Sequence, residues 1–263
     1  MKIIRSKDNP TYKFVNRLLK RKYRDETGMY LIEGLKPIKD AVSAGVGIKT
    51  LIVCDGDCTI YDNLNIECSD YDTVILEEKL FRNLADTKTS QGIIAVSEKK
   101  EYGICDLDRI LGSGNENIIV LDRLQDPGNM GTIIRTAEAA GYCGVLIMPG
   151  CADIYSSKAA RAAAGSLFRM PIIYGDKCDN VVRELKRFNR KIAVTSLDTD
   201  VFYYDTDISE NTALVIGNEG QGVSGDFIKL SDIKIKIPMK GSIESLNAAV
   251  AAGILMYQSC GIK

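Results

Sequence analysis

Residues 117–141, NIIVLDRLQDPGNMGTIIRTAEAAG, join an apolar run typical of a buried strand to a segment with the signals of a helix start. The Asp-Pro pair at 126–127 suits the N-cap and the first helical position. Asn129 and Arg135 follow in the first turns, where free backbone N–H groups favour anions. These side chains at a strand–helix junction indicate a ligand site. A structural role remains open, in which Asn129 caps the turn and Arg135 pairs with Glu138 or with the aspartate of that pair.

The same alternation continues along the rest of the chain. Apolar runs expected as strands stand at 117–122, 144–148, 170–174, 191–196, 213–217 and 233–238. Segments with helical signals stand at 126–141, 156–166, 179–188 and 244–260. Strands and helices in this order predict a parallel sheet with helices on both faces. Ligands of such sheets bind where loops leave the carboxyl ends of the strands.

The first hundred residues show a second, shorter alternation. Strand-like and helix-like patterns occur in MYLIEG (29–34), KTLIVC (49–54), DTVILEEKLFRNLAD (72–86) and QGIIAVSE (91–98). The stretch that follows is polar, with glycines near its end, which is typical of a linker. We therefore expect an α/β domain over residues 1–98, a linker over 99–116 and a larger domain over 117–263.

Two further loops of the larger domain carry signals at expected strand ends. LVIGNEGQGVSGD (214–226) has four glycines, which let the backbone approach a ligand closely. It lacks both the GK[ST] ending of a Walker A loop and the GxGxxG spacing of a dinucleotide site. In IPMKGSIESLNAAVAAGI (237–254), Ser245 and Asn247 stand at the start of an alanine-rich helix. Small residues on all sides predict burial on more than one face, with a dimer interface as the simplest cause.

The composition narrows the chemistry available to the chain. Its 263 residues include no histidine, which excludes Ser-His-Asp and Cys-His nucleophile systems and the HExxH zinc site. The eight cysteines form no CxxC pair, so we expect reduced structural thiols. Cys54 and Cys58 could bind a metal only together with a second pair of ligands, and the sequence offers none, so we expect no metal. With 45% hydrophobic residues, no apolar run of transmembrane length and no signal segment, the sequence predicts a cytoplasmic globular protein.

The net charge of −1 conceals a basic N-terminus. Residues 1–24 hold nine Lys and Arg against the single Asp8, whereas the rest of the chain holds 25 basic and 34 acidic groups. Clustered cations supply the salt-sensitive part of nucleic-acid affinity. The candidate contacts are Lys13, Arg17, Lys20 and Arg21. A solvated amphipathic helix explains the same pattern without a nucleic acid, and its apolar side would hold Tyr12, Val15, Leu18 and Leu19.

Three motifs, taken in order, carry a resemblance to a known family. DPGNMGTIIRTAEAAG, LVIGNEGQGVS and IPMKGSIESLN closely resemble the motifs of the SpoU/TrmH family of RNA ribose 2′-O-methyltransferases, in the SPOUT superfamily. YLIEGLKPIKDAV (30–42) and LADTKTSQGIIAV (84–96) are similar to the RNA-binding extension that often precedes this domain. The resemblance implies an α/β fold, in which a parallel-sheet C-terminal domain with a deep trefoil knot follows a small α/β RNA-binding domain.

The resemblance also implies a cofactor, partners and site residues. S-adenosylmethionine would bind in the knot at Thr195, Gly217, Asn218, Glu219, Ile237 and Leu246. The catalytic side chains would be Asn129, Arg135, Glu219, Ser245 and Asn247. Arg161 matches a further family arginine near the RNA. The implied partners are RNA and a second copy of the chain, which would bind through the C-terminal domain. Ribosomal RNA is implied rather than transfer RNA. Neither a metal nor a membrane is implied.

The implied reaction leaves the role of Arg135 open. A ribose hydroxyl must lose its proton as it attacks a sulfonium methyl, and the chain has no histidine to accept it. Free guanidinium keeps its proton below about pH 12. Arg135 is therefore either a base that loses its proton in the site, or the group that aligns the hydroxyl while the proton leaves through water or phosphate.

Two other classes of protein stay open at this point. A dinucleotide-dependent enzyme would need a phosphate fingerprint after the first strand, and DPGNMG lacks it. A non-catalytic RNA-binding or ribosome-assembly protein would need the basic N-terminus, but it has no use for the five polar side chains of the three motifs together.

Overall fold

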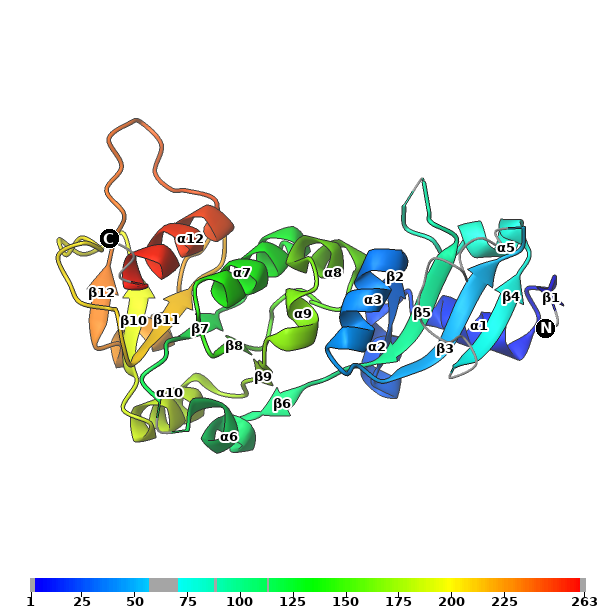
Figure 1. The fold of residues 1–263 in the computed structure, drawn as a ribbon. Helices are drawn as coiled ribbons and strands as arrows, with labels where there is room; N and C mark the ends of the chain where they lie inside the picture. Colours follow the sequence, from blue (N-terminus) through cyan, green and yellow to red (C-terminus); the bar gives the residue numbers. More distant parts are fainter. Residues whose placement is uncertain (1–2, 57–70, 88, 113, 261–263) are drawn as a thin grey trace. The chain divides into compact units, whose positions relative to one another are not determined.

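A computed structural model of the chain describes residues 3–56, 71–87, 89–112 and 114–260. The chain divides into two compact units (Figure 1). The smaller unit consists of Met1–Lys100 and Tyr155–Phe168, and the larger consists of Glu101–Ile154 and Arg169–Lys263. Within the described residues, no helix combines the length and the apolar character needed to cross a bilayer.

The smaller unit is built on a five-stranded mixed sheet. Its strands are β1 (Ile3–Ile4), β2 (Met29–Glu33), β3 (Ile48–Cys54), β4 (Asp72–Leu76) and β5 (Ile93–Glu98). In the order β1-β4-β3-β5-β2, the first two pairs are parallel and the last two are antiparallel. Its helices are α1 (Pro10–Arg17), α2 (Arg21–Thr27), α3 (Leu35–Ser43), α5 (Glu78–Arg82) and α8 (Ser157–Ala163). The α/β character predicted for this part of the chain is confirmed.

Helix α1 turns its apolar side to the core of the smaller unit. Asn9 caps the helix by accepting hydrogen bonds from two backbone N–H groups of the first turn, at 2.9 and 3.4 Å. Tyr12, Val15 and Leu18 are buried against residues of the sheet and of α5. Leu19 is 44% exposed, so its predicted place on the apolar side is wrong. The amphipathic helix therefore exists, and its basic side chains remain on the solvent side.

The larger unit contains a seven-stranded, wholly parallel sheet in the order β12-β10-β11-β7-β8-β9-β6. Its strands are β6 (Tyr102–Gly103), β7 (Ile118–Leu121), β8 (Gly144–Ile147), β9 (Ile172–Tyr174), β10 (Lys191–Thr195), β11 (Thr212–Ile216) and β12 (Ile233–Ile235). Its helices are α6 (Leu107–Leu111), α7 (Pro127–Ala139), α10 (Cys178–Arg187), α11 (Gly225–Leu230) and α12 (Ala248–Ser259), with a 3₁₀ turn η2 (Ile104–Asp106) before α6. The predicted parallel sheet is confirmed.

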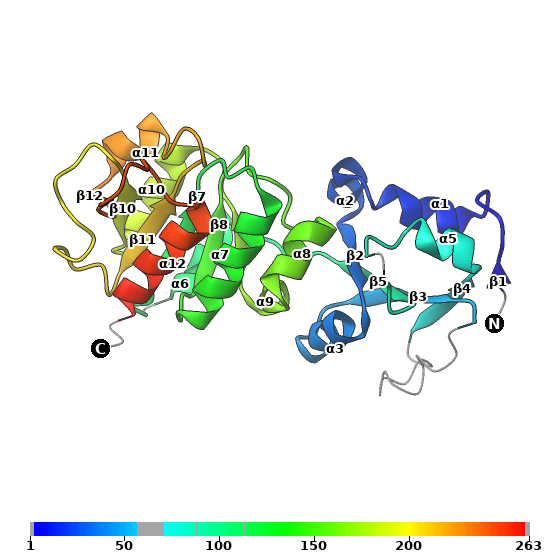
Figure 2. The same cartoon turned by 90° about the horizontal axis from the view of Figure 1, so that it is seen from above.

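Helices cover both faces of this sheet, which explains why its central strands β7 and β8 are apolar and buried along their whole length. Every residue of β7 is buried. Ile118 and Val120 belong to a core cluster with Leu107 of α6 and Leu185 of α10. Figures 1 and 2 both show α7 and α12 side by side on the other face.

Two segments differ from the sequence-based prediction because of contacts distant in sequence. The stretch 99–116, expected as a linker, contains β6 and α6, and Leu107 and Leu111 lie in the core of the larger unit. The helix expected over 156–166 is instead α8 followed by the short α9 (Ser166–Arg169). Ala164 and Gly165 between them both have positive φ, which ends a right-handed helix. Helix α8 packs on β2 within the smaller unit.

The last strand and the last helix are also shorter than predicted. Strand β12 ends at Ile235, and α12 begins only at Ala248. Asn247 is the N-cap of α12, so it precedes the helix that was expected to carry it. The residues between β12 and α12 are therefore free to form a wall of the cavity described next.

Candidate functional site

The loops after β10 and β11 and the segment before α12 enclose a cavity of about 450 Å³. Thr195, Gly217, Asn218, Glu219, Ile237 and Leu246, the six residues that the resemblance assigns to the cofactor, all line it. Ser245 lines it as well, whereas Asn129, Arg135 and Asn247 do not. The cavity lies at the carboxyl ends of β10, β11 and β12, where parallel sheets place their ligand sites.

The glycine loop after β11 is held closed by its own backbone. Asn218 and Gly222 exchange two backbone hydrogen bonds, of 3.0 and 2.9 Å. Gly222 has a φ of +70°, which favours glycine. A Cβ on Gly217 would lie 2.1 Å from the backbone nitrogen of Val223, so no side chain fits there. The other two glycines of 214–226 show neither feature, so the four glycines do not share one role.

Glu219 joins the glycine loop to the start of α7. Its carboxylate accepts hydrogen bonds from the backbone N–H groups of Gln125 (3.0 Å) and Asp126 (3.1 Å) and from Nδ2 of Asn129 (3.1 Å). Burial raises the pKa of Glu219, but these donors favour the charged form more strongly and hold the pKa below its ordinary value. A carboxylate that stays ionised and accepts from three donors is an anchor between two loops and a poor proton acceptor.

Asn129 links this anchor to the last helix. Its Oδ1 accepts a hydrogen bond of 2.9 Å from Nδ2 of Asn247. Asn247 in turn caps α12 by accepting from two backbone N–H groups of its first turn, at 2.9 and 3.3 Å. The cap of α7 is Asp126, which accepts from the N–H groups of Gly128 (2.6 Å) and Asn129 (3.2 Å). The structural alternative, in which the Asn129 side chain caps its own turn, is therefore wrong.

Arg135 lies further along α7 with an exposed side chain. In a purely structural role, Arg135 would pair with Asp126 or Glu138. Both carboxylates are engaged elsewhere, because Asp126 caps the helix and Glu138 accepts two hydrogen bonds from Arg169. No residue of the described chain forms a hydrogen bond or an ion pair with the guanidinium of Arg135. The structure thus leaves this guanidinium available to a ligand, although it does not bring Arg135 into the network of Asn129, Glu219 and Asn247.

Sequence reasoning missed two residues that hold the glycine loop from its other side. Asp122 is buried, and its carboxylate accepts a hydrogen bond of 2.6 Å from the backbone of Ser224. Arg123 has a φ of +59°, and its guanidinium donates to the side chain of Gln221 (3.2 Å) and to the carbonyl of Gly222 (3.3 Å). Their position in the sequence could have identified them, because both residues directly follow the apolar run of β7.

Replacing Glu219 by Gln should loosen the glycine loop, because the new amide group would face N–H donors that need an acceptor. The folded-state pKa of Glu219 is lowered, so its contribution to stability is present above the ordinary value of 4.5 and is lost as the pH falls through the lowered value. Thermal unfolding of both proteins between neutral and acid pH measures this. We expect a stability difference that shrinks as the pH falls, and a difference independent of pH would contradict the assignment.

The predicted RNA contacts lie in the smaller unit with exposed side chains: Lys13, Arg17, Lys20 and Arg21. Lys13 pairs with Asp8 at 2.7 Å, and Arg21 pairs with Asp25 at 3.5 Å. Arg17 lies over the ring of Tyr23, 5.4 Å from its centroid. Arg161 of α8 forms an ion pair with Asp86 in the same unit.

The described cysteines are free thiols: Cys54, Cys105, Cys143, Cys151, Cys178 and Cys260. Burial raises the pKa of Cys143 and of Cys151 to about 11, so both remain protonated at neutral pH. No group of side chains in the described part of the chain could hold a metal ion. Cys58 and Cys68 lie outside the described residues, and so does the expectation about the pair Cys54 and Cys58.

Comparison with known proteins finds two family matches and full-length relatives. Residues 116–257 match the SpoU rRNA Methylase family, and residues 9–95 match the MRM3-like substrate binding domain. The chain is 35% identical to the 23S rRNA (guanosine(2553)-2′-O)-methyltransferase RlmP of Bacillus subtilis, over 99% of this chain and 100% of that one. It is 32% identical to the 23S rRNA (uridine(2479)-2′-O)-methyltransferase of Streptomyces viridochromogenes, over 91% of this chain and 85% of that one.

Solved structures show the same fold over almost the whole chain. An AdoMet-bound rRNA methyltransferase from Sinorhizobium meliloti superposes with a TM-score of 0.87 at 30% identity, over 98% of this chain and 97% of that one. The AdoMet complex of the SpoU methyltransferase AviRb from Streptomyces viridochromogenes also gives 0.87 at 30% identity, over 96% of this chain and 97% of that one.

Proposed function

The chain belongs to the SpoU rRNA methylase family and transfers a methyl group from S-adenosylmethionine to a ribose 2′-hydroxyl of RNA, and we propose that its substrate is the RNA of the large ribosomal subunit. The observation that carries this proposal is the 35% identity, over the full length of both chains, to an enzyme that acts on 23S rRNA. Family membership disfavours the alternative of a non-catalytic RNA-binding protein. The proposed substrate also favours a cytoplasmic location.

We propose that S-adenosylmethionine binds in the cavity at the ends of β10, β11 and β12. Its volume of about 450 Å³ lies within the range of roughly 300–1,000 Å³ typical of small-molecule sites. Ile216, Ile237 and Leu246 offer apolar walls, and Thr195 and Asn218 offer polar groups. When bound, the cofactor supplies an electrophilic methyl group. The trefoil knot around this site stays a prediction of the family resemblance.

For the transfer reaction, we assign Arg135 the task of aligning the ribose. Its planar guanidinium can donate in a fork to a phosphate and a ribose oxygen, and no carboxylate of the described chain competes for it. The hydroxyl proton then leaves to water or to a phosphate oxygen. Asn129, Glu219 and Asn247 fix α7 relative to the cofactor loop and to α12. Ser245, which lines the cavity, is the remaining polar side chain proposed to contact the RNA.

Mapping of 2′-O-methyl nucleotides in RNA from a strain that lacks this protein tests the choice of substrate. We expect the loss of methylation at a nucleotide of the large-subunit rRNA, and its return when purified protein and S-adenosylmethionine are added to rRNA from that strain. Loss confined to transfer RNA would overturn the proposal while leaving the reaction type intact.

We also propose that the active form is a homodimer joined through α12. In the single chain α12 is buried on one broad side only. The sequence predicts burial on more than one face, and a partner chain would be needed to bury the second face. Val250 and Tyr257, seven residues apart on the helix, are 52% and 46% exposed. Large apolar side chains at this spacing form a stripe that a second copy would cover.

Light scattering at micromolar concentration should give the mass of two chains for the wild-type protein and of one chain for Tyr257→Asp. The new carboxylate would be buried without a partner in the interface. Phe14→Asp, on an exposed position of the smaller unit, serves as the control and should stay dimeric. A monomeric wild-type protein would contradict the proposed interface.

A further inference from the structure

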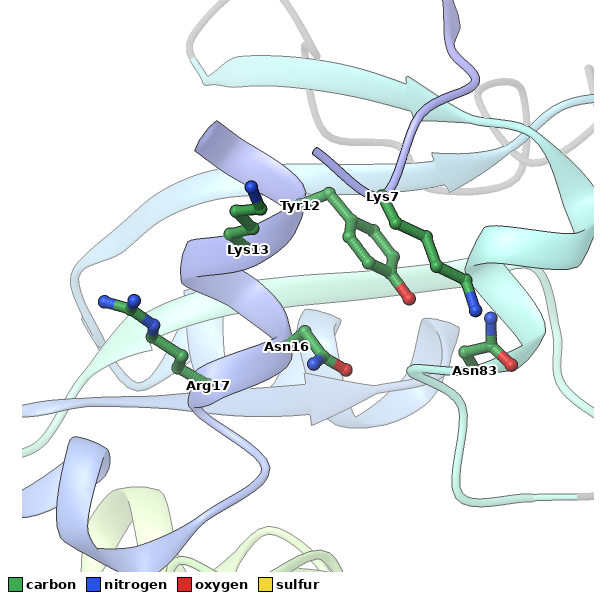
Figure 3. A pocket seen from close by; sticks show the side chains of 6 residues that line it. All are labelled: Lys7, Tyr12, Lys13, Asn16, Arg17 and Asn83. Carbon is green, nitrogen blue, oxygen red and sulfur yellow. The ribbon is translucent and has the colours of Figure 1, made fainter. Parts of the chain in front are cut away.

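A second cavity, also of about 450 Å³, lies in the smaller unit beside α1 (Figure 3). One lining residue precedes α1, four belong to α1, and one is the C-cap of α5. These residues are Lys7, Tyr12, Lys13, Asn16, Arg17 and Asn83. The cofactor cavity belongs entirely to the larger unit, so the role proposed for it leaves this second cavity unexplained.

The second cavity is positively charged. Three of its six lining residues are cations and none is a carboxylate. Lys13 pairs with Asp8, but both side chains are more than half exposed, and such an ion pair exchanges readily with a ligand. Lys7 and Arg17 have no acidic partner among the described residues. Three cations against Asp8 leave a net charge of +2, which attracts a polyanion such as a nucleic-acid strand.

The cavity also offers neutral hydrogen-bonding groups. Asn16 brings a carboxamide from α1 and Asn83 brings one from the end of α5, and each carboxamide has both donors and an acceptor. The ring of Tyr12 is buried in the core. Figure 3 shows its hydroxyl turned toward the ends of Lys7 and Asn83. A simple phosphate site needs only the cations, whereas carboxamides can also bind the edge of a base.

We infer, building on the RNA substrate proposed above, that this cavity holds one unpaired nucleotide of the RNA. Its base would contact Asn16 and Asn83, and the adjoining phosphates would contact Lys7, Lys13 and Arg17. Proteins recognise RNA sequence mainly in single-stranded loops, where the bases are free to enter a pocket. A duplex can place phosphates near the cations, but the Watson–Crick edges of its bases are already paired and its deep, narrow major groove keeps side chains out, so it cannot bring a whole base into the cavity.

Two double variants separate the base contacts from the phosphate contacts. The probes are a fluorescent RNA hairpin with an unpaired loop and the blunt duplex of the same stem. Asn16→Ala/Asn83→Ala keeps the charge, so we expect roughly tenfold weaker hairpin binding, an unchanged salt dependence and unchanged duplex binding. Lys7→Ala/Arg17→Ala should weaken binding of both RNAs, and it should lower the slope of log affinity against log salt for the hairpin by about 1.4, which is 0.7 for each lost cation.

Matched controls distinguish the cavity from the overall charge and from misfolding. Lys36→Ala/Lys49→Ala removes two cations of the same unit that lie outside the cavity, so it should affect the hairpin less than Lys7→Ala/Arg17→Ala does. Asn83→Asp keeps the shape of the side chain and adds a negative charge, so it should weaken hairpin binding more than Asn83→Ala. Calorimetry with S-adenosylmethionine and thermal unfolding check that each variant is folded.

Wild-type hairpin affinity in Asn16→Ala/Asn83→Ala, or equal losses for hairpin and duplex, would overturn the inference while leaving the proposed rRNA substrate standing. Conversely, loss of hairpin binding in these variants, together with methylation found only on transfer RNA, would support the nucleotide pocket and remove the proposed substrate.

Discussion

Replacing Arg135 by Lys should leave the affinity for S-adenosylmethionine nearly unchanged and slow single-turnover methyl transfer by roughly 10²-fold or more. The cofactor affinity should survive because Arg135 does not line the cavity proposed for the cofactor. The transfer rate should fall because an ammonium group keeps the positive charge but cannot reproduce the planar, forked geometry of a guanidinium. Calorimetry measures the first quantity, and rapid-quench transfer to substrate RNA measures the second.

Arg169→Lys is the matched control for this experiment. Arg169 is an arginine of the same unit, and it forms the ion pair with Glu138 that a merely structural Arg135 would have formed. Exposed pairs of this kind contribute on the order of 0–1 kcal/mol, so the control should transfer methyl groups at a near-normal rate. If Arg135→Lys behaves like the control, with normal cofactor affinity and a near-normal rate, the alignment role of Arg135 is wrong.

The parts of the structure that the sequence predicted well rest on local signals. Apolar runs identify strands buried on both faces, and their regular separation by helices gives the parallel sheet of the larger unit. The family motifs then indicate which strand ends carry the loops proposed to bind the cofactor. The six residues assigned to the cofactor line one cavity because they lie at the ends of β10, β11 and β12 or in the segments that follow them, and these strand ends meet at the same edge of the sheet.

The parts that the sequence did not predict depend on contacts between distant residues. The structural alternative gave the side chain of Asn129 a capping role because Asn commonly caps helices, yet this side chain bridges Glu219 and Asn247, 90 and 118 positions away. Helix α8 has good local helical signals, but its packing on β2 within the smaller unit arises only in three dimensions. The polar stretch before β7 looked like a linker, since the apolar side of so short a helix as α6 shows little periodicity.

The glycines of the loop after β11 form one group in the sequence but have different surroundings in the structure. Gly217 and Gly220 lie three positions apart in one flexible-looking motif, and neither has a positive φ. Their surroundings differ, because a Cβ on Gly217 would meet the backbone of Gly222 and Val223 at 2.2 and 2.1 Å, whereas a Cβ on Gly220 would meet nothing closer than 3.7 Å. Adding a single methyl group at each of these two glycines should therefore affect the loop very differently.

Gly217→Ala should weaken S-adenosylmethionine binding by roughly 10²-fold, whereas Gly220→Ala should leave it close to the wild-type value. At Gly217 the atoms in the way are backbone atoms, so the closed loop must open by an ångström or more and carry Asn218 and Glu219 out of position. Overpacking of this kind also costs about 1–3 kcal/mol of stability. Calorimetry and thermal unfolding measure the two effects. A cooperative unfolding transition in Gly217→Ala shows that the domain still folds, and such a protein with wild-type cofactor affinity would mean that the loop after β11 does not hold the cofactor.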